Sequence, residues 1–144
     1  MISEVYGAGG NSGAIYNADF VGLYNPTNAA APLSGLAIHY RSAAGGSGGA
    51  PVALSGSVPA KGHYLIRMSA VGANGAALPT PDATASLAMA AAGGQVALQK
   101  GTAIIATSGN TSGNASLRRL RRRQRRDQPT RPPRPPRPRP PRSR

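Results

Sequence analysis

The sequence predicts an all-β protein in which two sheets pack face to face as a sandwich, followed by a basic C-terminal tail. Three features support this prediction: short runs of alternating apolar and polar residues, turn-forming segments between them, and a concentration of Arg and Pro near the end of the chain. All nineteen Gly precede residue 114. Because glycine disfavours helix interiors, these clusters argue against reading the abundant Ala as helix.

The alternating runs are the expected strands, because successive side chains of a strand point to opposite faces. In the clearest run, Leu36, Ile38 and Tyr40 share one face, which predicts a buried side. The stretch 84–92 fits either a strand or a short helix, and we favour the strand. The expected strands cover residues 2–6, 20–25, 36–41, 63–68 and 95–99.

The net charge of +13 is unevenly distributed along the 144 residues. Residues 1–117 contain four Lys or Arg against three acidic residues, a balance of +1. Residues 118–144 contain thirteen Arg against the single Asp127, a balance of +12. The strongly basic character therefore belongs to the tail, and the body of the protein is close to neutral.

Little in the body points to metal or catalytic chemistry. The chain has no Cys, which excludes disulfides and thiol ligands. Its two histidines, His39 and His63, fall on the expected solvent side of strands, and the partners of suitable type are only Glu4, Asp19 and Asp82. Because no acid, base and nucleophile occur in a plausible order, we expect no metal site, no cofactor and no enzymatic activity.

Three other features have structural interpretations. Residues 7–13 are rich in Gly but lack the Lys-Ser/Thr ending or following helix of a phosphate site, so we expect a flexible loop. Asp19 and Asn25 flank an expected strand, where capping of loop N–H groups is favoured over a calcium or ligand role. We expect the tyrosines to pack in the core or across strands rather than to form a ligand platform; they are Tyr6, Tyr16, Tyr24, Tyr40 and Tyr64.

Four motifs occur in a familiar order. They are Ile2-Ser3-Glu4-Val5-Tyr6, Asp19-Phe20-Val21-Gly22-Leu23-Tyr24-Asn25, Leu33-Ser34-Gly35-Leu36-Ala37-Ile38 and Val58-Pro59-Ala60-Lys61-Gly62-His63-Tyr64-Leu65-Ile66. Across about residues 2–100 this order resembles the lamin-tail domain, in the form found in secreted bacterial proteins. The positions that match the family's motifs, and to which the resemblance gives a structural role, are Glu4, Asp19, Phe20, Asn25, Leu33, Ser34, Gly35 and Pro59.

The resemblance implies an immunoglobulin-like β-sandwich over residues 1–106, incomplete at its C-terminal end. It also implies a non-catalytic interaction or scaffolding module, extracellular or on the cell surface in its relatives, that binds a protein or a cell-surface ligand. Gly22 replaces the usual Glu and Leu36 replaces the usual Trp, so we expect a less stable domain than is typical. Met1 lies directly before the first strand, where exported relatives carry a signal peptide, so we expect either a misplaced start codon or a truncated gene.

The remaining residues divide into a Ser/Gly/Asn linker, residues 107–117, and the tail, residues 118–144. The tail holds thirteen Arg and eight Pro and has too little apolar surface to fold alone, so we expect it to be disordered. One interpretation is sequence-independent binding of nucleic acid or another polyanion. The arginines that would carry this binding are Arg118, Arg119, Arg121, Arg122, Arg123, Arg125 and Arg126.

Two other interpretations of the tail remain open. Residues 132–137 contain the pattern P-x-x-P-x-R of a proline-motif ligand. Alternatively, the tail is read out of frame, because the family typically has Phe-Val-Gly-Tyr-Gly near this point and the next frame across residues 117–121 can encode it. A frame break near residues 106–117 would deprive the sandwich of a strand or two, and we would then expect partial unfolding or aggregation.

Overall fold

A computed structural model of the chain describes residues 1–109, and these consist of strands, turns and loops without any helix. The predicted all-β class is confirmed for this part of the chain. The predicted tail and residues 110–117 of the predicted linker lie outside the described residues. Among residues 1–109, no helix has the length and apolar character needed to cross a membrane.

The first sheet has four strands in the order β1-β2-β7-β8. Its strands are β1 (Ile2–Tyr6), β2 (Phe20–Tyr24), β7 (His63–Arg67) and β8 (Ala83–Thr84). The neighbours are antiparallel except for β8, which runs parallel to β7. The sheet therefore has β1 and the very short β8 as its two edges.

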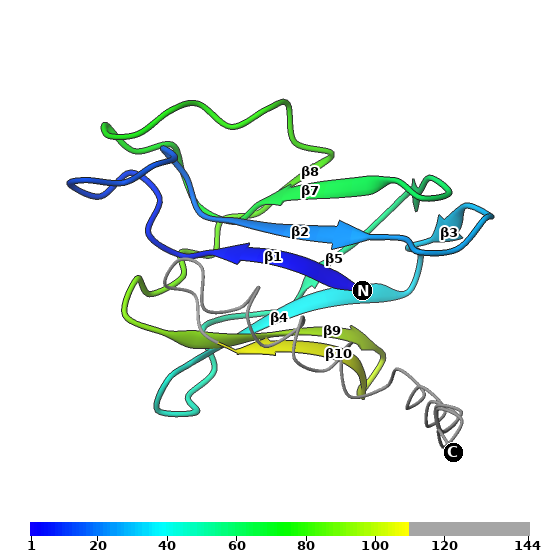
Figure 1. The fold of residues 1–144 in the computed structure, drawn as a ribbon. Helices are drawn as coiled ribbons and strands as arrows, with labels where there is room; N and C mark the ends of the chain where they lie inside the picture. The colour runs from blue at the N-terminus through cyan, green and yellow to red at the C-terminus, as the bar shows by residue number, and fades with distance from the viewer. Residues whose placement is uncertain (110–144) are drawn as a thin grey trace, which may run out of the picture.

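The second sheet also has four strands, in the order β10-β9-β4-β5, and all its neighbours are antiparallel. Its strands are β4 (Leu36–Ser42), β5 (Val52–Ala53), β9 (Gly94–Lys100) and β10 (Ala103–Gly109). A separate ribbon pairs β3 (Ala31–Pro32) with β6 (Ser57–Val58). Figure 1 shows the two sheets as two layers, with the β9–β10 hairpin at the bottom of the second layer.

The core lies between the layers and is built from alternate residues of the strands. In β2 the inward side chains are Val21 and Leu23, and in β4 they are Ile38 and Tyr40, all of them buried. Both strands thus place one face in the core and the other outward, as period-two alternation predicts. The five expected strands are confirmed, with bounds that differ by at most one residue at either end.

Two segments differ from the sequence-based expectations. In the stretch 84–92, only residue 84 belongs to a strand, and no helix forms. Leu87 and Met89 are nevertheless buried alternately, so this segment is extended without a complete ladder. Strand β10 continues to Gly109, three residues beyond the expected end of the domain at residue 106.

Candidate interaction surface

Strand β2 begins immediately after a buried carboxylate, that of Asp19, which is only 4% exposed. One carboxylate oxygen accepts the N–H of Gly9 at 2.8 Å, and the other accepts the N–H of Met89 at 2.7 Å. The backbone N–H of Asp19 donates to the hydroxyl of Ser69 at 2.9 Å. Because these partners come from three distant segments, Asp19 ties the loops at this end of the molecule to one another.

Strand β2 ends at a second buried polar side chain, Asn25, which is 3% exposed. Its Nδ2 donates to the carbonyl oxygens of Ala29, Val58 and Pro59 at 2.7–3.1 Å. Its Oδ1 accepts the backbone N–H of Thr27 at 3.1 Å and the Thr27 hydroxyl at 2.8 Å. Asn25 therefore closes its own loop and holds that loop against the segment that follows β6.

The Gly-rich loop of residues 7–13 packs against other loops. A side chain at Gly9 would place its Cβ 1.9 Å from the carbonyl carbon of Ala18, and one at Gly10 would meet the Cα of Gly72 at 2.6 Å. Gly10 also has a φ of 75°, in the left-handed region that glycine adopts without strain. Glycine is therefore needed here for close backbone approach, and the N–H of Gly9 is engaged by Asp19.

The outward face of the first sheet carries two groups of rings. In the first group, the rings of Tyr6 and Phe20 stack at 5.5 Å, and Tyr16 meets each of them edge to face at 5.5–5.6 Å. Phe20 is buried beneath the two tyrosines, which stay half-exposed. Because offset and edge-to-face pairs stabilise the positions of rings, the two tyrosines are held in defined orientations.

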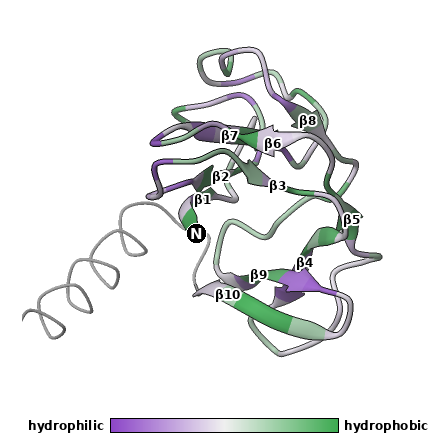
Figure 2. Cartoon of the chain, turned by 90° about the vertical axis from the view of Figure 1, so that its right-hand side faces the viewer, coloured by the Kyte–Doolittle hydropathy of each residue, from purple (hydrophilic) through white to green (hydrophobic). Residues whose placement is uncertain are grey.

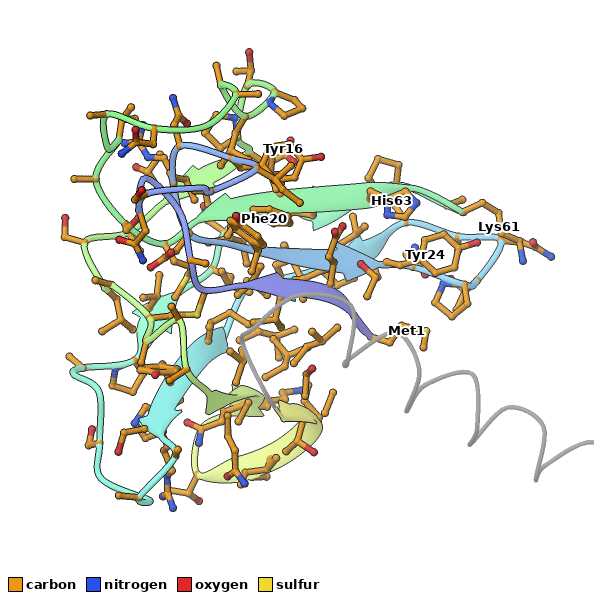
Figure 3. All side chains as sticks on the ribbon, turned by 60° about the vertical axis from the view of Figure 1, so that its left-hand side comes forward. Met1, Tyr16, Phe20, Tyr24, Lys61 and His63 are labelled. Carbon is orange, nitrogen blue, oxygen red and sulfur yellow. The ribbon has the colours of Figure 1, made fainter. Side chains whose placement is uncertain are left out.

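The second group lies at the other end of β2, where the rings of Tyr24 and His63 are 4.8 Å apart and tilted by 36°. Figure 3 shows this pair and Lys61 at one end of the sheet and Phe20 with Tyr16 at the other. Between them Gly22 faces outward without a side chain, opposite Glu4 and Leu65 in the ladders. The outer face of β1, β2 and β7 thus has a group of rings at each end, and we call it the aromatic face.

The two remaining tyrosines are buried. Tyr40 accepts the N–H of Ala90 at 3.0 Å, and the hydroxyl of Tyr64 donates to the carbonyl of Ser55 at 3.0 Å. Burial raises the pKa of Tyr64 above its usual value, and the negative charge of Asp82 raises it further, although the bond to Ser55 works in the opposite direction. Both side chains hold loops to the core.

Within residues 1–109, the histidines and the charged side chains do not lie together at one site. His39 lies 3.4 Å from Ser47 Oγ on one side and 3.4 Å from Gln99 Nε2 on the other, whereas His63 is exposed on the opposite sheet. Within residues 1–109, no group of three or more His, Cys, Asp or Glu could hold a metal ion. Arg67 lies opposite Phe20, and its buried Nε has no hydrogen-bond partner in this part of the chain.

The motif residues fall into three places in the structure. Asp19, Phe20 and Asn25 lie at the ends of β2, and Asn25 contacts the carbonyl of Pro59 directly. Leu33 is buried in the core and begins the turn through Ser34 and Gly35, in which the N–H of Leu36 donates to the Leu33 carbonyl at 3.0 Å. Glu4 is exposed on β1, away from the other motif residues.

Several residues of the surface carried no clear signal in the sequence. Ser69, which binds the backbone of Asp19, is one serine among many in the chain. Tyr16 lies in an irregular loop, so no strand pattern indicates that its ring packs on Phe20. The seven arginines between Arg118 and Arg126 lie outside the described residues.

The chain matches no family of known proteins, no curated protein and no solved structure.

Proposed function

We propose that the two sheets form an immunoglobulin-like sandwich of the lamin-tail type, acting as a non-catalytic module that binds a protein or cell-surface ligand. The observation that supports this proposal is the aromatic face, where half-exposed rings are fixed on a sheet that is rigidly tied at both ends. Tyrosine rings with a polar tip are favoured in contact surfaces because they bury much area and lose little conformational freedom.

The buried polar groups support binding rather than catalysis. Asp19 and Asn25 have the burial expected of functional residues, but their polar atoms are used in bonds to the backbone of the same chain. Each oxygen of the Asp19 carboxylate accepts a backbone N–H, so this side chain holds loops together and neither oxygen is directed at a partner. The exposed rings are therefore the groups available to a partner.

Binding of fluorescently labelled full-length protein to purified bacterial cell walls tests the proposal. The assay is run in about 0.5 M NaCl, which suppresses adsorption through the basic tail. Combined substitution Tyr24→Ala and His63→Ala should weaken binding at least about tenfold. The matched control is His39→Ala with Gln95→Ala on the outer face of the other sheet, which should leave binding unchanged. Equal binding by both variants, or none by the original protein, would contradict the proposal.

A second candidate function is polyanion binding through the tail, favoured by the balance of +12 in residues 118–144. The full chain is titrated with a labelled DNA duplex over a series of salt concentrations and compared with a chain in which the seven arginines from Arg118 to Arg126 are replaced by Ser. The proposal predicts salt-sensitive binding that the replacement largely removes, because each neutralised phosphate releases counterions. Equal binding by the two chains would exclude the cluster as the binding element.

A further inference from the structure

Sheet edges expose unpaired backbone groups, and proteins usually protect them with short strands, proline, charge or bulges. Strand β5 has two residues and follows Pro51, and β8 has two residues and follows Pro81 and Asp82. Strand β1 carries the exposed Glu4 at its centre and has a bulge between Ile2 and Glu4. Three of the four edges of the two large sheets are therefore protected.

Strand β10 is the fourth edge, and its sequence lacks most of these devices. It is seven residues long, Ala103–Gly109, and contains neither a charged residue nor proline. Ile104 and Ile105 are 56% and 54% exposed, and the only irregularity is a shift of register between Ile104 and Ala106. Figure 2 shows the start of β10 as an apolar stripe along the border of the molecule. Within residues 1–109 no strand pairs with its outer edge.

We infer that β10 is a pairing edge for a second copy of this chain, so that the β10-β9-β4-β5 sheets of two molecules join into one continuous sheet. Strand β10 is uncharged and residues 1–117 have a balance of only +1, so two copies meet without strong repulsion between the paired strands. Pairing also covers the exposed isoleucines of both molecules. Because the other edges are protected, the assembly closes at two copies.

The basic tail of the same chain, residues 118–144, is a poorer occupant of this edge. Residues 118–144 hold thirteen Arg and eight Pro. Proline cannot donate to a ladder, and a strand of like charges would not cover isoleucine side chains favourably. A second copy of β10 supplies both the N–H groups and the apolar side chains that the edge lacks.

The tail charge determines the relative direction of the paired strands. The balance of +12 follows each β10 closely in the sequence, so parallel strands would bring two highly charged segments together. In an antiparallel pair the ends of the seven-residue strands are about 20 Å apart, more than twice the Debye length of about 8 Å at physiological salt. The pair is therefore antiparallel, and added salt strengthens it by screening the remaining repulsion.

Sedimentation equilibrium of the full chain tests the inference. The expected mass rises with protein concentration from 14.6 kDa to twice that value and no further. Ile104→Lys should weaken association at least about tenfold because it places a charge on the edge. Val71→Lys is the matched control, since Val71 is 57% exposed in a loop, and it should associate like the original protein. A monomer at all concentrations and salts, a mass that grows beyond two copies, or equal loss in both variants would overturn the inference.

Cysteine scanning tests the same pairing without depending on loss of association. The chain has no Cys, so single substitutions at Ile104, Ile105, Ala106 and Thr107 each create one thiol, and Ala106 lies at the centre of the strand. A disulfide needs Cα atoms about 4.4–6.8 Å apart, so an antiparallel pair allows self-crosslinking only near its centre. We expect one or two of the four positions to form linked dimers under mild oxidation, and Val71→Cys to form none. Crosslinking at all four positions indicates parallel strands, and crosslinking at none indicates no pairing; either result overturns the inference.

Discussion

Strands β2 and β10 are organised in opposite ways. Strand β2 is a central strand whose two ends are held by buried polar side chains, Asp19 and Asn25. Together these side chains bind four other segments, at Gly9, Met89, residues 27–29 and residues 58–59. Within residues 1–109, strand β10 is hydrogen-bonded to one strand only, β9, and it has exposed isoleucines and no charge. The polar residues thus fix the first sheet and its aromatic face, whereas the outer edge of β10 has no partner strand within residues 1–109, which is the basis of the proposed pairing.

Removal of the carboxylate before β2 should have the largest effect on stability. Asp19→Ala leaves the N–H groups of Gly9 and Met89 without their acceptor in a buried place, which should lower the free energy of unfolding by about 3 kcal/mol. Urea denaturation followed by circular dichroism measures this loss. Asp82→Ala is the control, because Asp82 accepts a single, exposed N–H from Leu65, and it should lose less than about 1 kcal/mol. Equal losses would mean that Asp19 does not tie the loops.

Loss of the amide at the other end of β2 should have the next largest effect. Asn25→Ala removes bonds to the loop at Ala29 and to the carbonyls of Val58 and Pro59, for a loss of about 2 kcal/mol in the same assay. Asn25→Asp distinguishes the accepted bonds from the donated bonds, because it keeps the accepting oxygen but replaces the donating Nδ2 with an oxygen that faces three carbonyls. It should be at least as unstable as the Ala variant. If the Asp variant matches the original protein, the donated bonds contribute nothing.

Replacing Glu4 on β1 with Val should make the edge of this strand as available for pairing as the edge of β10. Glu4→Val deletes the exposed charge of β1 and gives each molecule a second pairing edge, so association should no longer close at two copies. The gain at the new edge should be about 1 kcal/mol, roughly fivefold in the association constant. Light scattering should detect species heavier than a dimer, while Glu4→Lys, which keeps a charge at the centre of the edge, should remain dimeric. Unchanged association of the Val variant would show that Glu4 does not protect the edge.

The smallest expected effect concerns alkaline pH. Burial and Asp82 raise the pKa of Tyr64 in the folded protein above the ordinary value of 10.0, so folding favours the neutral phenol. The associated stability is present below pH 10 and is lost as the pH rises through the raised pKa. Denaturation at a series of pH values should show a decline above pH 10 that is shallower in Tyr64→Phe. Parallel declines in both proteins would assign the effect to other groups.

The sequence predicted the long strands of the core, because their alternation reflects burial directly. Leu36, Ile38 and Tyr40 share the inward face of β4 as expected, although Leu36 lies half-buried at the border of the core. The four strands of two residues have too few positions to produce a pattern. Strand β10 was missed because its two adjacent isoleucines interrupt the alternation at the irregularity between Ile104 and Ala106.

The surface was less predictable than the core. The position of Asp19 and Asn25 on either side of a strand indicated capping, but their partners Met89 and Pro59 are 70 and 34 residues away along the chain. Contacts of this kind depend on how loops meet in three dimensions and leave no local pattern. The aromatic face could be identified only after the register of β1, β2 and β7 had placed Tyr24 beside His63.

Hydrogen–deuterium exchange of the full chain tests the contrast between the central strand β2 and the edge strand β10 most directly. Amides of β2 should exchange slowly at every protein concentration, because this strand is paired with β1 on one side and β7 on the other within one molecule. Amides of β10 should become several-fold more protected between about 2 µM and about 200 µM protein, while those of β1 should not change. Protection of β10 that is independent of concentration, or protection of β1 that rises with it, would contradict this account.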